Sequence, residues 1–310
     1  MLSPSDFMSI PFDDWINTLV RDWLVPNFRP LFRSMQWPVT QVLNGLSAAF
    51  NALPMLVFTA LLSLLAWRTA GRGVAIFTLV ALLFIDLIGL WPETMTTLAM
   101  VVTAVFFCVI IGIPLGVIAA RSDVFRAILR PILDIMQTIP SFVYLVPIVM
   151  LFGVGVVPGI IATIIFALPP IIRLTDLGIR NVRHDLTEAA TAFGATPWQM
   201  LIEVQFPLAM RTVMAGLNQT LMLALSMVVI AALIGAGGLG LTVFTGLGRL
   251  DVGNATAGGV GIVLLAIILD RISQALGEKR AAHSPSLLET MRSLFSLRRP
   301  VPAADAERAG

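Results

Sequence analysis

The stretch EAATAFGATPWQMLIEVQFP, residues 188–207, is a moderately polar island in a very hydrophobic chain. A short helix is expected from Leu186 to Phe193, with Asp185 as its N-cap. Glu188 lies three residues further on and completes a capping-box-like pattern. Gly194 suits the left-handed position that often follows a helix end. The island therefore begins with a helix that stops at a glycine.

A second short helix is expected directly after this glycine. Thr196 provides the cap, Pro197 takes the first helical position and Gln199 the third, which completes a capping box. Pro207 is expected to end or kink this helix, because proline lacks the main-chain N–H. Two short helices joined at a glycine can present a surface to another protein or lie on a membrane as a connector. The shape alone leaves both interpretations open.

Long apolar segments surround the island and predict an all-α polytopic membrane protein. The chain is 57% hydrophobic and only 12% charged, whereas about a quarter of the residues in soluble domains are charged. About 20 apolar residues cross a bilayer as a helix, and seven transmembrane helices are expected. Their windows are residues 42–67, 74–91, 94–120, 134–173 (two spans around the turn at 153–159), 211–249 and 254–269.

The distribution of basic residues predicts the orientation. With seven spans, 16 of the 20 lysines and arginines fall on one side and 4 on the other. Because basic loops stay in the cytoplasm, the N-terminus is expected outside and the C-terminus inside. The island at residues 188–207 then lies in a cytoplasmic loop.

Four regions are expected along the chain. Residues 1–41 form an extracytoplasmic segment with an amphipathic helix at 11–25, whose tryptophans suit a membrane interface. They lack the basic start and apolar core of a signal peptide. Residues 42–92 form peripheral transmembrane helices, and 93–277 form a transmembrane core. Residues 278–310 form a poorly ordered cytoplasmic tail.

Several kinds of chemistry have no support in the sequence. Cys108 is the single cysteine, so a disulfide within the chain is excluded. The chain has neither a phosphate-binding P-loop motif nor an HExxH zinc motif. The glycine run at 234–248 follows an apolar helix rather than a strand, which disfavours dinucleotide binding. Broken backbone here is a candidate gate or pathway wall, or serves close helix packing.

Charges inside predicted spans are functional candidates. Asp86 either snorkels to the interface or has a partner. Asp134 and Asp270 lie at helix ends beside arginines, which favours ordinary ion pairs. The sequence shows no series of membrane carboxylates, which counts against a proton- or sodium-coupled pump.

The island also resembles a known motif, the EAA motif of bacterial ABC importer permeases, E-A-A-x3-G-x9-I-x-L-P. The matching residues are Glu188, Ala189, Ala190, Gly194, Val204, Phe206 and Pro207, with valine for isoleucine and phenylalanine for leucine. The resemblance implies a coupling helix at residues 186–196 that docks into a separate cytoplasmic ATPase subunit. ATP and Mg²⁺ would be bound by that partner, with no cofactor or metal and no catalytic residues on this chain.

Four further blocks resemble permeases for glycine betaine, proline betaine and choline: residues 134–147, 165–175, 215–230 and 258–271. The resemblance implies the type I ABC importer permease fold in the bacterial inner membrane, as a homodimer. It also implies an extracytoplasmic substrate-binding protein that delivers a quaternary ammonium compound for osmoprotection or nutrition. Nucleic acid is not an expected partner; the lipid bilayer is.

Candidates for the translocation path are Phe142, Tyr144, Asn218, Gly237 and Gly238. Aromatic faces attract quaternary ammonium ions, so Phe142, Tyr144 and Phe152 can offer weak contacts to such a solute along a path. The alternative is that these rings face lipid or pack.

Three rival functions stay open at this point: a permease for another small solute, a secondary transporter or channel without an ATPase, and a membrane enzyme. The membrane enzyme has the least support, because the sequence contains no recognisable set of catalytic residues.

Overall fold

The computed structural model describes residues 12–282, and each of its elements is a helix. Residues 1–11 and 283–310, which hold the start of the N-terminal segment and most of the predicted tail, lie outside the described residues. In chain order the elements are α1 Phe12–Asn17, η2 Thr18–Leu24, α2 Val25–Ala52, α3 Met55–Ala70, α4 Arg72–Leu87, α5 Trp91–Arg121, α6 Asp123–Thr138, η3 Ser141–Tyr144, α7 Leu145–Phe152, α8 Val156–Arg180, α9 His184–Ala192, α10 Pro197–Gln199, η4 Met200–Gln205, α11 Phe206–Ala231, η5 Ala232–Ile234, α12 Leu239–Gly248 and α13 Val252–Ala282.

The expected all-helical membrane fold is confirmed, with fewer straight spans than seven. Within the described residues, four helical segments are long and apolar enough to cross a bilayer: Trp91–Arg121, Val156–Arg180, Pro197–Ile234 and Val252–Gly277. Two bent helix pairs raise the number to six if each pair forms one span. α3 and α4 have 16 residues each, or about 24 Å at 1.5 Å per residue. Each is therefore shorter than the hydrocarbon core of about 30 Å.

Proline explains both bent pairs. The chain turns by 106° between α2 and α3 and by 105° between α6 and the η3–α7 segment. Leu53 and Ile139, the residues at the two bends, have extended backbone and each precedes a proline. Proline crowds the residue before it and disfavours the helical conformation there. The apolar windows at 42–67 and after 134 therefore each contain a corner instead of one straight helix.

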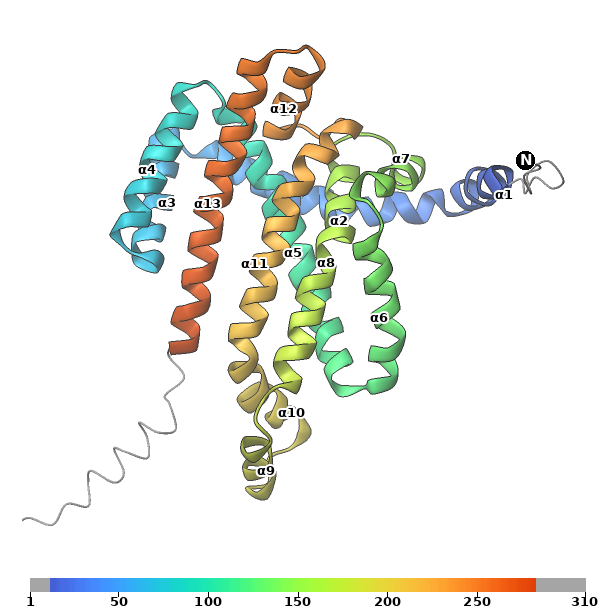
Figure 1. Ribbon diagram of the computed structural model, residues 1–310, viewed down its shortest axis with the longest axis vertical. Coiled ribbons are helices and arrows are strands. Elements are labelled where there is room, and N and C mark those ends of the chain that lie inside the picture. Colours follow the sequence, from blue (N-terminus) through green and yellow to red (C-terminus); the bar gives the residue numbers. More distant parts are fainter. Residues whose placement is uncertain (1–11, 283–310) are drawn as a thin grey trace, which may run out of the picture.

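The centre of the molecule is a layer of long helices in which α8 packs against both α5 and α11 (Figure 1). α13 packs on α11 and α12, and the α3–α4 pair lies beside it. α2 runs across the bundle at a steep angle, where Gln36 Nε2 donates to the Phe152 carbonyl at 2.7 Å. α9 and α10 lie at one end of the bundle, and α12 lies at the other. The predicted boundary at residue 41 falls inside the continuous helix α2.

Close approach of α5 and α8 depends on small residues. A Cβ on Gly116 would lie 2.5 Å from Thr175 Cβ and 2.8 Å from the Ile172 carbonyl oxygen. We expect Gly116→Ala to destabilise the protein by about 1–3 kcal/mol, the usual range for overpacking. The thermal midpoint of the detergent-purified protein measures this loss. Gly259→Ala in α13 is the matched control, because no atom lies within 4 Å of its Cβ; equal midpoints for the two variants would contradict the prediction.

The glycine run breaks the helix as predicted, between η5 and α12. Gly235 and Gly238 have φ values of +82° and +77°, which favour glycine. The Leu239 N–H donates to Thr97 Oγ1 on α5 at 2.8 Å, and a Cβ on Gly238 would lie 2.4 Å from the same oxygen. Close packing against the start of α5 therefore explains Gly238.

Candidate functional site

The polar segment, residues 184–207, joins α8 to α11 at the end of the bundle opposite α12 (Figure 1). Its first helix, α9, follows Arg183, so the expectation that Asp185 caps the helix is wrong. Asp185 instead lies in the first turn and accepts hydrogen bonds from Arg183. The hydrogen bond from Arg183 holds the pKa of Asp185 below its ordinary value. Glu188 faces His184, with Oε1 3.1 Å from Nδ1, and makes no capping box.

The end of α9 at Gly194 is confirmed, and its geometry is a Schellman motif. The Gly194 N–H donates to the Thr191 carbonyl at 2.9 Å, and the Ala195 N–H donates to the Ala190 carbonyl at 3.0 Å. Gly194 has φ +84°, a conformation that favours glycine. No atom lies within 4 Å of a Cβ placed there, so the requirement at this position comes from the backbone alone.

The predicted capping box of the second helix is confirmed. Thr196 accepts from the Gln199 N–H at 3.3 Å, and Gln199 Oε1 accepts from the Thr196 N–H at 2.9 Å. Pro207 does not end this helix, because the chain passes through the π-helical turn η4 directly into α11. That Pro207 kinks the helix stays a prediction. Pro207 is the second residue of α11, directly after this π-helical turn.

The polar segment presents an exposed face with large apolar residues. Glu188 and Ala189 are exposed and Ala190 is half-buried. Phe193 is 93% exposed and Trp198 is 66% exposed, on either side of Gly194. Aromatic anchors of this kind dominate many protein interfaces. The sequence reasoning did not select these two residues, although bulky aromatic side chains in an otherwise polar loop were the available signal.

One arginine bonds the polar segment to the bundle, and a second, at the end of α8, joins α8 to α5 and α6. Arg121, the last residue of α5, donates to the Pro197 carbonyl. Arg180, the last residue of α8, lies just ahead of α9 and donates to the Ala119 carbonyl at 2.7 Å. Its Nη1 lies 2.7 Å from Asp123 Oδ1 at the start of α6. The polar segment is therefore bonded to the end of α5, and the end of α8 from which it continues is bonded to α5 and α6.

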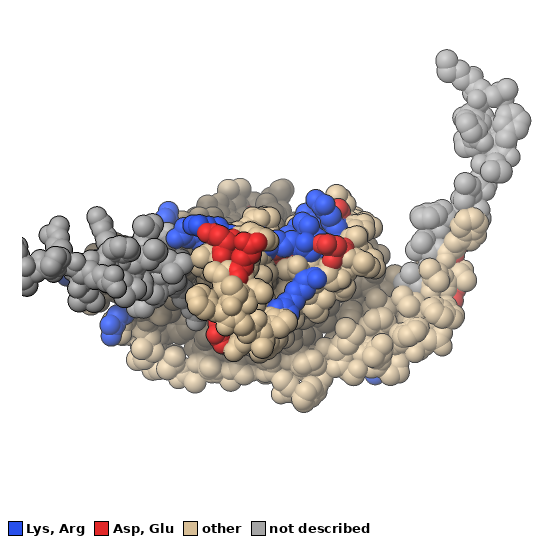
Figure 2. Space-filling view, turned by 90° about the horizontal axis from the view of Figure 1, so that it is seen from below, with Lys and Arg blue, Asp and Glu red and all other residues tan. Residues whose placement is uncertain are grey.

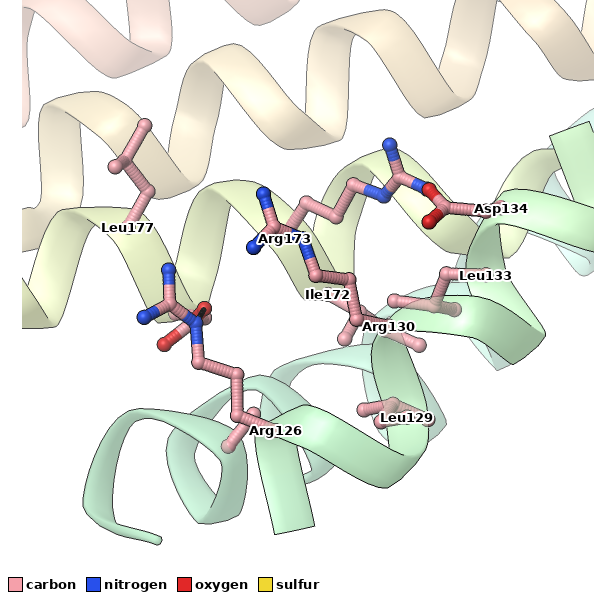
Figure 3. A pocket seen from close by; sticks show the side chains of 10 residues that line it. Arg126, Leu129, Arg130, Leu133, Asp134, Ile172, Arg173 and Leu177 are labelled. Carbon is pink, nitrogen blue, oxygen red and sulfur yellow. Dashed lines mark hydrogen bonds and ion pairs between the residues drawn. The ribbon is translucent and has the colours of Figure 1, made fainter. Parts of the chain in front are cut away.

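Asp176 on α8 is the centre of this arginine network. Its side chain is only 11% exposed and its two oxygens bind two arginines, Arg180 Nε at 2.8 Å and Arg126 Nε at 2.9 Å. Arg126 comes from α6, so the network crosses from one helix to the other. A cavity of about 290 Å³ lies between α6 and α8 beside it (Figure 3). Arg173 and Asp134 close the far end of this cavity with an ion pair of 2.6 Å, as expected for Asp134. Asp176 was not among the candidates chosen from the sequence.

Charged side chains gather at this end of the molecule. Figure 2 shows the acidic and basic groups clustered in the view from below, over a surface that is otherwise formed by uncharged residues. The C-terminal half of α13 runs toward the same end (Figure 1), and Ser273 there donates to Asn218 in the first half of α11.

The three aromatic candidates for the path have different environments. Phe142 is exposed. The Tyr144 hydroxyl donates to the Met136 carbonyl, which fixes the bend after α6. Phe152 packs edge-on against Phe32 of α2 with ring centroids 5.2 Å apart. No ring contact joins the three within residues 12–282.

Asn218 has a different environment from the aromatic candidates. Its Nδ2 donates to Asp270 Oδ1 at 2.8 Å, and its Oδ1 accepts from Ser273 at 2.6 Å. These bonds fasten α11 to α13. Among the described residues Asp270 has amide partners, Asn218 and Gln274, and the predicted ion pair with an arginine is absent.

Gly237 and Gly238 lie at the opposite end of the bundle, where they line a second cavity between α5 and α12. Asp86 at the end of α4 is exposed. It forms no ion pair with another residue that the structure describes, which favours the snorkelling alternative.

The fold and the polar segment together define a polytopic helical membrane protein of the type I ABC importer permease class. The family model for the binding-protein-dependent transport system inner membrane component matches residues 112–281. The chain belongs to this family, and it is the transport permease subunit that the family describes.

Several curated relatives are similar over most of the chain. The glycine betaine/proline betaine transport system permease protein ProW of Escherichia coli (strain K12) is 57% identical over 277 residues, which cover 89% of this chain and 78% of the relative. The glycine betaine transport system permease protein OpuAB of Bacillus subtilis (strain 168) is 45% identical, with 87% and 96% covered. The glycine betaine/carnitine transport permease protein GbuB of Listeria monocytogenes is 44% identical, with 87% and 97% covered.

A solved structure supports the fold. One chain of the MetNI methionine ABC transporter, in an inward-facing conformation, aligns with a TM-score of 0.52 and 27% identity. The alignment covers 62% of this chain and 94% of that chain. The permease fold is thus shared with a chain of a methionine ABC transporter.

Proposed function

We propose that this permease carries quaternary ammonium compatible solutes, the class of glycine betaine, proline betaine and choline, into the cell. The observation that carries the proposal is the 57% identity over 277 residues with a glycine betaine/proline betaine permease. The aligned residues make up 89% of this chain and therefore include most of its membrane helices. The physiological use that follows is osmoprotection or nutrition.

The polar segment is proposed as the coupling element toward a cytoplasmic ABC ATPase subunit. Glu188, Ala189, Ala190, Gly194 and Pro207 belong to the motif that supports this role. The exposed Phe193 and Trp198 supply apolar anchors for the ATPase groove. ATP and Mg²⁺ are bound and ATP is hydrolysed on that partner, so this chain carries no catalytic residues. ATPase closure would then move the polar segment and, through the Arg121 hydrogen bond and the direct chain connection to α8, the helices α5 and α8.

The remaining assembly follows from the same proposal. A second copy of the chain completes the pathway, and an extracytoplasmic binding protein delivers the solute with high affinity. The N-terminus is placed outside and the C-terminus in the cytoplasm of the bacterial inner membrane. The charged residues at the polar-segment end and the position of the α13 terminus support this orientation.

Transport driven by ATP is tested by reconstitution. The permease is purified with the proteins encoded beside its gene and placed in proteoliposomes with radiolabelled glycine betaine or choline. We expect an ATPase to co-purify and uptake to require ATP and the binding protein. Uptake that persists without ATP while an ion gradient is maintained would establish a secondary transporter instead. ATP-driven uptake of an unrelated solute, with none of glycine betaine or choline, would retain the ATPase coupling and reject the substrate class.

A further inference from the structure

The second cavity lies at the start of α5, about 46 Å along a 31-residue helix from the polar segment. Its volume is about 470 Å³, within the range of roughly 300–1,000 Å³ that is typical of small-molecule sites. The wall comes from the first turns of α5, the glycine break and α12, together with the start of α13. The lining residues are Leu90, Pro92, Glu93, Thr96, Gly237, Gly238, Leu241, Thr242, Thr245 and Asn254.

Glu93 is the charged residue of this lining, which contains no lysine, arginine or histidine. Its Oε2 atom is buried and has no hydrogen-bond partner in the part of the chain that the structure describes. A buried carboxylate oxygen without a partner is costly. Buried polar groups of proteins are normally satisfied, so the missing partner needs an explanation. A cation in the cavity offsets this cost through its charge alone, without a hydrogen bond and without touching Oε2, which has almost no accessible surface.

Two other polar side chains in the lining are available to a ligand. The Asn254 side chain and the Thr242 hydroxyl make no hydrogen bond within residues 12–282, whereas Thr96 and Thr245 donate to carbonyls of their own helices. An amide and a hydroxyl can donate to a carboxylate. The cavity therefore offers a negative group for an ammonium ion together with donors for an acid group.

The glycine break holds this cavity in shape. Thr97 Oγ1 donates to the Glu93 carbonyl at 2.8 Å and accepts from the Leu239 N–H at 2.8 Å. A Cβ on Gly238 would lie 3.1 Å from the Glu93 carbonyl oxygen. The backbone of Glu93 is thus fastened to the loop that separates α11 from α12. Movement of that loop changes the cavity around the carboxylate.

We propose that this cavity is a receiving site for the quaternary ammonium group, with Glu93 as its counter-ion. The inference rests on the proposed function, because it names where the solute released by the binding protein first contacts the permease. The solute's ammonium group lies against the Glu93 carboxylate, and a carboxylate, where the solute has one, bonds to Asn254 and Thr242. A site that is partly open and has a single counter-ion binds weakly, which suits passage rather than storage.

Ligand binding to the purified full-length permease tests the site directly. Saturation-transfer NMR is recorded with choline and with 3,3-dimethylbutan-1-ol, its uncharged carbon isostere. We expect choline to bind in preference to the isostere, and Glu93→Gln to weaken choline binding about tenfold, the effect of 1.4 kcal/mol. Glu93→Asp keeps the charge and restores part of the binding. Asp86→Asn, an exposed carboxylate at the same end of the bundle, leaves it unchanged.

Uptake by the reconstituted importer separates this inference from the proposed function. If the wild type transports glycine betaine or choline while the Glu93→Gln protein transports and binds equally well, the receiving site is rejected and the function stands. Equal binding of choline and its isostere also rejects the site. If the wild type transports neither solute, both proposals fall. A thermal midpoint of Glu93→Gln equal to that of the wild type shows that a lost ligand contact, not misfolding, causes the weaker binding.

Discussion

Replacement of Gly194 by aspartate is expected to abolish uptake while the permease still inserts and folds. No atom lies within 4 Å of a Cβ at this position, and aspartate tolerates the left-handed backbone better than most residues. The cost to the fold is therefore only about 1 kcal/mol of backbone strain. The new carboxylate would stand between Phe193 and Trp198, on the face that we assign to the ATPase. Burying an unpaired charge there removes the partner.

Co-purification of the ATPase and ATP-driven uptake measure this effect. Gly194→Asn is the matched control, since asparagine has nearly the same size, accepts the left-handed conformation and has no charge. We expect it to retain more of the ATPase than the aspartate variant does. Wild-type uptake by Gly194→Asp, with the ATPase still bound, would contradict the assignment of the polar segment.

Replacement of Asp176 by asparagine is expected to uncouple transport from the ATPase without releasing that partner. The side chain is 11% exposed and is held by Arg126 and Arg180, and hydrogen bonds to charged groups contribute about 1.5–3 kcal/mol each. The substitution keeps the shape but removes the charge that joins α8 to α6. Because the face at Phe193 is unchanged, ATPase binding should persist. Uptake should fall by about tenfold or more, since a rise of about 1.4 kcal/mol in the activation free energy slows a step tenfold.

Arg130→Gln is the matched control for this network. Arg130 lines the same cavity as Asp176 (Figure 3), but it has no ion pair among the described residues. It should leave uptake within about twofold of wild type, as surface substitutions usually change stability by less than about 0.5 kcal/mol. Equal losses in both variants would show that local charge, rather than the bridge between helices, matters here.

Local signals predicted the polar segment well because its chemistry is local. Gly194 and the pair Thr196–Gln199 are defined by hydrogen bonds across three to five residues, so their residue types indicate their geometry. The first cap was misplaced because Asp185 has an arginine two residues before it, and the ion pair replaced the cap. Residue spacing alone does not show whether the Asp185 carboxylate bonds to the helix N-terminus or to the neighbouring arginine.

The candidate path was harder to predict because its members come from distant segments. Tyr144 and Asn218 were chosen for residue type, yet both have partners that hold helices together. Glu93 was overlooked, since a glutamate in the first turn of a helix is ordinary by sequence. Only the tertiary structure shows that Glu93 Oε2 is buried without a partner, close to the point where the glycine break packs against α5.

The sequence by itself determined the all-helical membrane class, the end of α9 and the family. Composition and motif spacing can be read along the chain and do not depend on how the helices pack. The tertiary structure alone decided which prolines bend the chain. Pro54 and Pro140 follow extended residues and mark corners, whereas Pro114 and Pro169 lie inside α5 and α8. Proline disfavours a helix before it by a modest energy. Prolines also lie inside α2 and α6, at Pro30, Pro38 and Pro131, so proline by itself does not mark a corner. Whether a helix continues through a proline or turns before it depends on the contacts that distant segments make on either side, and only the tertiary structure contains those contacts.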